Sequence, residues 1–279
     1  PLAREAEKRG VKVIRLNIGQ PDLPTPQEGI DALKTIDRKV LEYSPSEGLL
    51  SLREKLADYY HRFNINVTAN DIIVTTGGSE AVLFAFMACL DPGDEIIIPE
   101  PAYANYMAFA ISAGAKIVTV PSTIDEGFAL PPVADFEKLI TPRTKGILIC
   151  NPNNPTGSLI TPDKLKTILT HCKETNTYVM IDETYIEFVP DVDELSAIPL
   201  TELFDNVIIL RGTSKFFATP GLRLGYAITS NSQILTDINT NKNPWMINSL
   251  AVVAGETMFL DEEYIAVSYT HLRAHETGR

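Results

Sequence analysis

The stretch GILICNPNNPTGSLITPDKLKTILTHCKETNTYVMID, residues 146–182, decides the fold class. It begins with a continuous apolar run (146–150), passes through a helical pattern (162–175) and ends on a second apolar run (177–182). Continuous apolar runs are typical of strands that are covered on both faces, and two such strands joined by a helix form a parallel pair. The stretch therefore predicts an α/β fold.

The same alternation extends to both sides of this stretch. We expect seven strands, at residues 71–76, 95–99, 116–120, 146–150, 177–182, 207–210 and 225–229. Helical patterns lie at residues 49–63, 79–90, 102–114 and 162–175. The predicted fold class is α/β, a three-layer α-β-α sandwich built around a mostly parallel seven-stranded sheet.

Composition narrows the class of protein. The 279 residues, 44% of them hydrophobic, suffice for one large domain, or for one domain and part of a second. The formal net charge of −12 argues against nucleic acid and anionic membranes as partners. No apolar run is long enough to span a bilayer and the chain opens without a signal segment, so we expect a cytoplasmic protein. Three cysteines without paired spacing indicate reduced thiols.

Candidate binding residues follow the predicted strands at their carboxyl ends, where open parallel sheets bind ligands. After the first strand, Gly77, Gly78 and Ser79 open directly into a helix, whose free N–H groups and dipole suit a phosphate. A Gly-Gly turn capped by a serine is, taken alone, more often a simple connection. The chain contains neither GxGxxG nor GxxxxGKS/T, so the motifs of dinucleotide and nucleoside triphosphate binding are missing.

Four more candidates follow other strands. Asn154 lies in the turn after the strand at 146–150, Asp182 closes the next strand, and Lys215 and Arg223 follow the strand at 207–210. Asn154 alone would only shape its turn. A carboxylate and a lysine at the ends of buried strands need partners, because burying an unpaired charge is costly. The convergence of these side chains on one edge of the sheet predicts a binding site.

This set of residues fits a phosphorylated aldehyde cofactor. Lys215 would form an imine with the aldehyde, be displaced by the substrate amine, and then move the α-proton as general base. Asp182 would keep the ring nitrogen protonated, so that the ring accepts electrons. Asn154 and Tyr185 would hydrogen-bond the phenolic oxygen of the ring, and the helix N-terminus with Arg223 would hold the phosphate.

The ordered motifs resemble those of the class I and II aminotransferases, which are pyridoxal-phosphate enzymes of fold type I. The motifs are GGSEA (77–81), PAYANY (101–106), NPNNPTG (151–157), DETY (182–185), SK (214–215) and GLRLGY (221–226). The N-terminal half is similar to aspartate and aromatic transaminases. The C-terminal half, with RGTSKFFATPGLRLGY (211–226) and NPWMINSLA (243–251), is similar to the histidinol-phosphate transaminase and threonine-phosphate decarboxylase branch.

The resemblance implies roles that the residue types alone would not suggest. Tyr103 stacks on the cofactor ring, and Tyr43, in EYSPSEG (42–48), reaches the phosphate of the neighbouring subunit in a homodimer. Gly19, in LNIGQPD (16–22), lies with Asn154 near the substrate. The residues around the phosphate are Gly78, Ser79, Glu80, Ser214 and Arg223. No metal is expected.

The implied function is that of an aminotransferase, which moves an amino group between an amino acid of aspartate or aromatic type and a 2-oxo acid. Two alternatives stay open. A pyridoxal-phosphate-dependent lyase or decarboxylase acting on an amino acid, phosphorylated or not, would use the same Lys215, Asp182 and Arg223. A catalytically silent fragment would only bind the cofactor.

We expect four parts along the chain. They are an N-terminal segment (1–40), a large cofactor-binding domain (41–258), the start of a small domain (259–267) and a disordered or non-native tail (268–279). The resemblance implies that most of a small C-terminal domain is missing, and with it an arginine that binds the substrate carboxylate.

Overall fold

Seven strands form a single sheet in the computed structural model, which describes residues 2–14, 19–21, 23–189 and 191–276. The order across the sheet is β1-β7-β6-β5-β4-β2-β3. The strands are β1 (Ile72–Thr75), β2 (Glu95–Glu100), β3 (Lys116–Pro121), β4 (Thr144–Cys150), β5 (Tyr178–Asp182), β6 (Val207–Gly212) and β7 (Gly225–Ile228). Each lies where the sequence predicts a strand, within two residues at each end.

The sheet is mostly parallel, as predicted. All neighbouring pairs from β6 through β5, β4 and β2 to β3 are parallel, and β7 alone runs antiparallel to its neighbours β6 and β1. No crossover helix separates β6 from β7, so the chain returns beside β6 in the opposite direction. The start of β7 therefore lies at the same edge as the carboxyl ends of the parallel strands.

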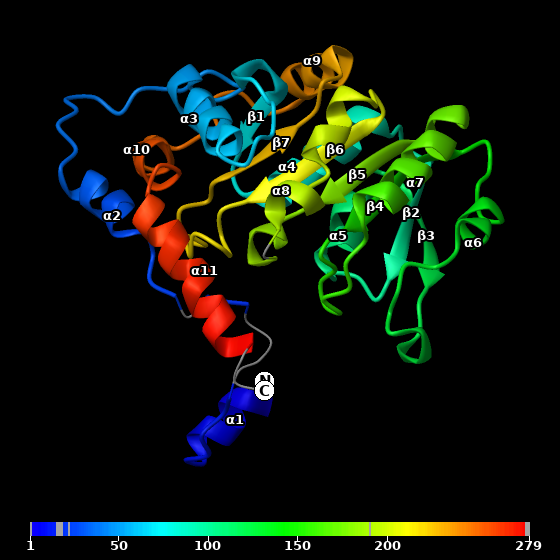
Figure 1. Cartoon of the computed structure of the whole chain (residues 1–279), viewed down its shortest axis with the longest axis horizontal. Coiled ribbons are helices and arrows are strands. Elements are labelled where there is room, and N and C mark those ends of the chain that lie inside the picture. Colours follow the sequence, from blue (N-terminus) through cyan, green and yellow to red (C-terminus); the bar gives the residue numbers. More distant parts are fainter. Residues whose placement is uncertain (1, 15–18, 22, 190, 277–279) are drawn as a thin grey trace.

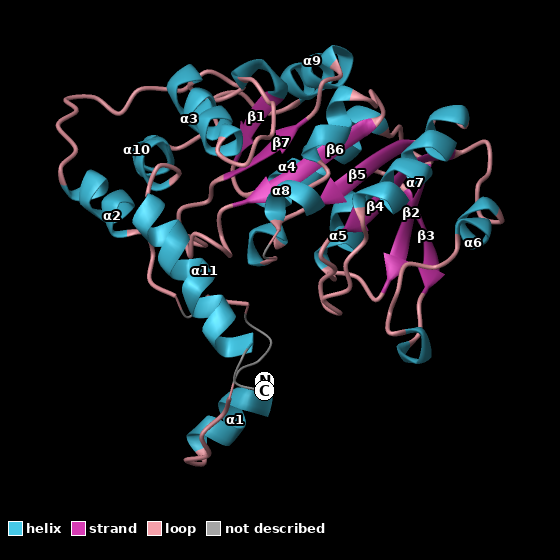
Figure 2. Ribbon diagram, viewed as in Figure 1, coloured by secondary structure: helices cyan, strands magenta, loops and turns pink. Residues whose placement is uncertain are grey.

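Helices cover both faces of the sheet (Figures 1 and 2). The helices of the described chain are α1 (Leu2–Lys8), α2 (Gln27–Lys34), α3 (Leu50–His61), α4 (Gly78–Cys89), α5 (Asn105–Ser112), α6 (Val133–Glu137), α7 (Pro162–Glu174), α8 (Val192–Leu195), α9 (Ser232–Asn241), α10 (Ser249–Met258) and α11 (Glu262–Glu276). One core joins α3, α7 and α10 to the sheet, and a second joins α4, α5 and α9 to its other face.

The residues of β5 show how the layers arise. Val179 and Ile181 belong to the core of α3 and α7, whereas Met180 between them belongs to the core of α4 and α5. Successive side chains of a strand point to opposite faces, so a strand covered on both sides must be apolar throughout. Burying each such side chain stabilises the fold by about 1.5–3 kcal/mol.

The segments outside the sandwich differ in part from expectation. Residues 268–276, expected to be disordered or non-native, continue the helix α11, and residues 277–279 lie outside the described part. Figure 1 shows α11 (red) and α1 (dark blue) extending away from the sheet. Of the stretch LNIGQPD, the structure describes Gly19 but not residues 15–18 or 22. No described helix is both long enough and apolar enough to cross a membrane.

Candidate active site

A cavity of about 550 Å³ opens at the edge of the sheet where β4, β5 and β6 end. A volume of this size suits a small organic ligand. Ten of the twelve residues that the sequence nominates line it: Gly19, Gly78, Ser79, Tyr103, Asn154, Asp182, Tyr185, Ser214, Lys215 and Arg223. The structure thus brings together residues from six separate segments of the chain.

An anion cradle forms where β1 turns into α4. Gly77 has a φ of 86°, a conformation that residues with a Cβ rarely adopt. A Cβ on Gly77 would lie 2.7 Å from Nη2 of Arg223, so the guanidinium packs directly over the turn. Nη1 of Arg223 donates to the Pro220 carbonyl (3.0 Å), which orients the side chain. The free N–H groups of the helix and the guanidinium together favour a bound anion.

Strand β7 supports this cradle from behind. A Cβ on Gly225 would lie 2.3 Å from the carbonyl carbon of Gly77 and 2.4 Å from the backbone nitrogen of Gly78. Both are main-chain atoms that cannot rotate away, so only glycine permits this approach. The first residue of β7 and the first turn of α4 are therefore fixed against each other.

Asp182, the last residue of β5, is buried at the cavity wall. Its Oδ2 accepts a hydrogen bond from the Tyr106 hydroxyl (2.6 Å), and its Oδ1 accepts one from the Thr184 N–H (2.9 Å). Burial raises the pKa of Tyr106 well above its usual value, which keeps that hydroxyl protonated as a donor. The two bonds fix the orientation of the carboxylate and leave acceptor capacity for a ligand.

Tyr106 is one of six cavity residues that the sequence did not single out, with Val82, Ala104, Phe109, Thr184 and Pro220. Tyr106 follows Tyr103 by three residues at the start of α5, and the two rings meet edge to face with centroids 5.3 Å apart. The Tyr106 N–H donates to the Tyr103 carbonyl (3.0 Å), and this turn brings both tyrosines of the PAYANY motif to the cavity. Helix α5 begins at Asn105 instead of 102, which leaves Tyr103 in the loop that precedes it.

Lys215 extends into the cavity and is half-buried. Its Nζ donates to the Gly19 carbonyl (2.7 Å). A Cβ on Gly19 would lie 2.9 Å from this Nζ and 4.0 Å from the Tyr185 hydroxyl, so these three residues meet at one point. Burial lowers the pKa of Lys215. A larger fraction of the amine is therefore neutral near pH 7, and only the neutral form is nucleophilic.

Two nominated residues do not line the cavity. The Glu80 carboxylate turns back to accept the Thr76 N–H (2.7 Å), so its side chain lies apart from the cavity wall on which the phosphate was expected. An acidic residue in the first helical turn commonly bonds such a free backbone N–H. Tyr43 is 79% exposed, with its ring 5.1 Å from that of Trp245. Its role toward a neighbouring subunit stays a prediction.

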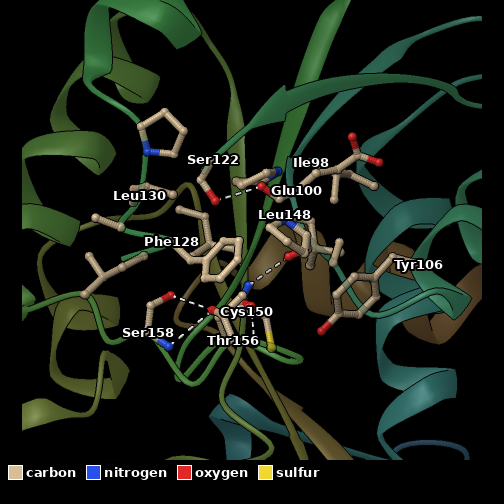
Figure 3. A pocket seen from close by; sticks show the side chains of 18 residues that line it. Ile98, Glu100, Tyr106, Ser122, Phe128, Leu130, Leu148, Cys150, Thr156 and Ser158 are labelled. Carbon is tan, nitrogen blue, oxygen red and sulfur yellow. Dashed lines mark hydrogen bonds between the residues drawn. The ribbon is translucent and has the colours of Figure 1, made fainter. Parts of the chain in front are cut away.

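A second pocket lies beside the cavity, between β2, β4 and the loop at 122–131 (Figure 3). It has room for roughly one water molecule, with a volume of about 20 Å³. Tyr106 lies at its edge and also lines the larger cavity. The larger cavity is therefore the candidate ligand site, and Tyr106 forms part of the wall between the two spaces.

The lining residues fit a phosphorylated aromatic aldehyde. The cradle at Gly77 accepts a phosphate, Asp182 offers a carboxylate for a protonated ring nitrogen, and Lys215 offers a primary amine for the aldehyde. Tyr103 supplies an aromatic face along the cavity wall. Amine, carboxylate and anion cradle share one cavity, which is the arrangement that such a cofactor requires.

Comparison with known proteins gives a consistent result. The family model described as "Aminotransferase class I and II" matches residues 11–276. The putative aminotransferase YugH of Bacillus subtilis is 38% identical over 218 residues, which cover 77% of this chain and 56% of that protein. The aspartate aminotransferase of Thermotoga maritima is 30% identical over 272 residues, which cover 96% of this chain and 72% of that protein.

The solved structures extend the similarity to three dimensions. A double mutant of the aspartate aminotransferase of Thermus thermophilus superimposes with a TM-score of 0.87 at 29% sequence identity. The superposition covers 98% of this chain and 72% of that chain. The described fold therefore corresponds to the greater part of a longer protein of known architecture.

Proposed function

The chain belongs to the class I and II aminotransferase family, and from this premise we propose that it is a pyridoxal-phosphate-dependent aminotransferase. Its substrates are an amino acid of aspartate or aromatic type and a 2-oxo acid. The observation that carries the proposal is the meeting of Lys215, Asp182 and the cradle under Arg223 in one cavity. The similarity to proteins named aspartate aminotransferase supports the substrate class.

Bound pyridoxal phosphate supplies an aldehyde that condenses with amines and a ring that withdraws electrons from the substrate Cα. Lys215 is the amine that would hold the cofactor's aldehyde, and its lowered pKa favours the neutral form that this role needs. Nζ would also be the group placed to accept and return a proton at the substrate Cα. The Gly19 carbonyl, 2.7 Å away, holds Nζ in place.

Asp182 would keep a proton on the ring nitrogen, because an adjacent carboxylate stabilises the charged form. The Tyr106 and Thr184 bonds keep its oxygens oriented toward the cavity wall. Asn154 and Tyr185 would hold the phenolic oxygen, and Tyr103 would supply an aromatic face for the ring. Gly78, Ser79, Ser214 and Arg223 would hold the phosphate.

The first test is borohydride reduction of the protein mixed with pyridoxal phosphate, followed by peptide mass mapping. We expect a cofactor-sized adduct on Lys215 and none in the Lys215→Ala variant. Lys242 is the internal control, because burial lowers its pKa to about 8 but also shields its Nζ, so this amine should stay unmodified. An adduct on Lys242, or none on a folded chain, would contradict the proposal.

A second test defines the reaction. With an amino acid donor and a 2-oxo acid acceptor, we expect a new amino acid and a new 2-oxo acid in equal amounts. Release of carbon dioxide or ammonia instead would identify a decarboxylase or lyase. Absence of any product, with the Lys215 adduct present, would identify a chain that only binds the cofactor.

We further propose a homodimer to which Tyr43 contributes across the interface. Val40, Leu41, Tyr43 and Trp245 are each more than half exposed, and the ring contact of Tyr43 with Trp245 joins the two segments into one apolar patch. Patches of this kind mark protein interfaces. Light scattering should show a dimer, and Tyr43→Ala should weaken phosphate binding. A monomer that binds pyridoxal phosphate with full affinity would contradict this role.

A further inference from the structure

Three charged side chains lie buried on the face of the sheet opposite to Asp182. Nη2 of Arg211 is 3.0 Å from Oε2 of Glu183, and Nη1 of Arg211 is 2.7 Å from Oε1 of Glu187. All three side chains are almost completely excluded from solvent. We call Arg211, Glu183 and Glu187 the buried triad. None of them lines the cavity, so none touches its ligand.

Two members of the buried triad belong to the segment that carries Asp182 and Tyr185. Glu183 is the residue after Asp182, and its N–H donates to the Leu210 carbonyl (2.9 Å), which extends the pairing of β5 with β6 by one step. Because side chains alternate along an extended chain, Asp182 points to the cavity face and Glu183 to the opposite one. Glu187 lies in the single turn just after Tyr185.

The third member belongs to the segment that carries Lys215. Arg211 lies in β6, four residues before Lys215. A Cβ on Gly78 would lie 3.3 Å from the Arg211 carbonyl oxygen, so the Arg211 backbone also touches the anion cradle. The ion pairs from Arg211 to the two glutamates therefore connect all three parts of the cavity: the cradle, the carboxylate segment and the lysine segment.

Further contacts hold the side chains of the triad in fixed orientations. Glu183 accepts the Ala197 N–H (2.5 Å) and the Ser196 hydroxyl (3.0 Å), and the Arg211 guanidinium lies 5.4 Å from the centre of the Tyr60 ring. Burial raises the pKa of both glutamates, and the guanidinium opposes that rise. Apolar side chains of the same volume often give equal or greater stability, so stability alone does not account for three buried charges.

We propose that the buried triad is a positioning device for the cavity, in which Arg211 fixes the distance between the Asp182 segment and the Lys215 segment. Arg211 acts through the backbone on both sides and is a positioning residue. Its effect on pyridoxal phosphate rests on the proposed function, whereas its effect on the two segments does not.

The test replaces the triad by residues of similar volume, in the variant Arg211→Met/Glu183→Gln/Glu187→Met. The amide introduced by Glu183→Gln keeps an acceptor for the Ala197 N–H, so the variant is designed to fold. We expect a thermal midpoint close to that of the parent chain, but at least tenfold weaker binding of pyridoxal phosphate. The pH midpoint of the bound cofactor's absorbance should also shift. A folded variant with unchanged affinity and unchanged midpoint would overturn the proposal.

Hydrogen exchange in the cofactor-free chain supplies a readout that is independent of the cofactor. We expect the amides at residues 184–187 and 213–215 to exchange at least tenfold faster in the variant. Unchanged exchange would count against positioning. A parent chain that gives no Lys215 adduct would instead count against the proposed function, while the exchange result would still decide the positioning role.

Two further variants complete the design. Glu187→Gln keeps the volume and an acceptor for Arg211. If the triple variant does not fold, this single variant tests the positioning role. We expect it to bind pyridoxal phosphate more weakly than the parent chain, by a smaller factor than the triple variant. Arg143→Met is the matched control, because Arg143 pairs with Glu95 (2.7 Å) at the start of β2, away from the cavity. It should leave affinity, midpoint and exchange unchanged.

Discussion

Asp182 and Glu183 are consecutive acidic residues with opposite surroundings. In the described part of the chain, the partners of Asp182 are neutral donors, the Tyr106 hydroxyl and the Thr184 N–H. Glu183 is fully buried against the Arg211 guanidinium and two further donors. The carboxylate that faces the cavity has no cationic partner among the described residues, whereas its neighbour is paired with Arg211 within the fold. One peptide bond therefore separates an open carboxylate from a paired one.

Asp182→Asn tests the binding side of this comparison and should have the largest effect. The amide keeps the shape and can still accept the Tyr106 bond, but it cannot hold a proton on the ring nitrogen. We expect pyridoxal phosphate to bind and turnover to fall on the order of 10³-fold, with little change in unfolding free energy. Turnover within tenfold of the parent chain would remove Asp182 from the role of ring-nitrogen partner.

Glu183→Ala tests the structural side. It leaves the buried Arg211 with one partner fewer and deprives the Ala197 N–H of its acceptor. We expect a loss of about 3–5 kcal/mol in unfolding free energy, because breaking a buried pair leaves uncompensated charge. Urea denaturation measures this loss. A loss below about 1 kcal/mol would mean that water or a rearranged side chain takes the place of the carboxylate.

Lys215 and Lys242 show a similar difference between a lysine that faces the cavity and one that is buried in the fold. Lys215 opens on the cavity and bonds to Gly19, whereas Lys242 is buried with no hydrogen-bond partner for its Nζ among the described residues. Burial lowers the pKa of Lys242 to about 8, although Glu47 and Glu80 oppose the shift; Arg53 reinforces it. Its neutral form is therefore more populated in the folded chain than in the unfolded chain.

The sign of the pH dependence follows from this shift. Between about pH 8 and pH 10.5 the unfolded chain holds a proton on Lys242 that the folded chain lacks, so stability rises with pH in this window. The rise amounts to at most about 3 kcal/mol. Lys242→Met should abolish it and should be more stable than the parent chain at pH 7. The unfolding free energy is measured by urea denaturation at pH 7.5 and at pH 10. An equal change between the two pH values in the parent chain and in the variant would exclude the effect.

Tyr106→Phe should have the smallest effect. The change removes the 2.6 Å bond to Asp182 and leaves the ring contact with Tyr103 in place. A hydrogen bond to a charged group contributes about 1.5–3 kcal/mol, and water from the cavity can replace part of it. We expect turnover to fall about tenfold with the fold intact. An unchanged rate would show that Thr184 alone orients Asp182.

The seven strands were predictable because burial on both faces demands continuous apolar runs, which stand out in the sequence. Asp182 and Lys215 were then predictable as site residues, because the carboxyl ends of parallel strands lie at the same edge of a sheet. What could not be predicted depends on neighbours distant in sequence. The pairing of Glu183 with Arg211 needs β5 and β6 side by side, and the direction of Glu80 depends on one free N–H at Thr76.

Because β7 pairs antiparallel with β6, the connection between them at residues 213–224 has a fixed length. Gly212 and Gly225 pair across the two strands, and both the N–H and the hydroxyl of Thr213 bond to the Leu224 carbonyl, which closes the segment on itself. Lys215 and Arg223 both lie within it. Surface connections usually tolerate insertions, but here one added residue would move Lys215 relative to Arg223. Both the length of this segment and its buried side chains, among them Phe216 and Phe217, are therefore constrained by the sheet beside it.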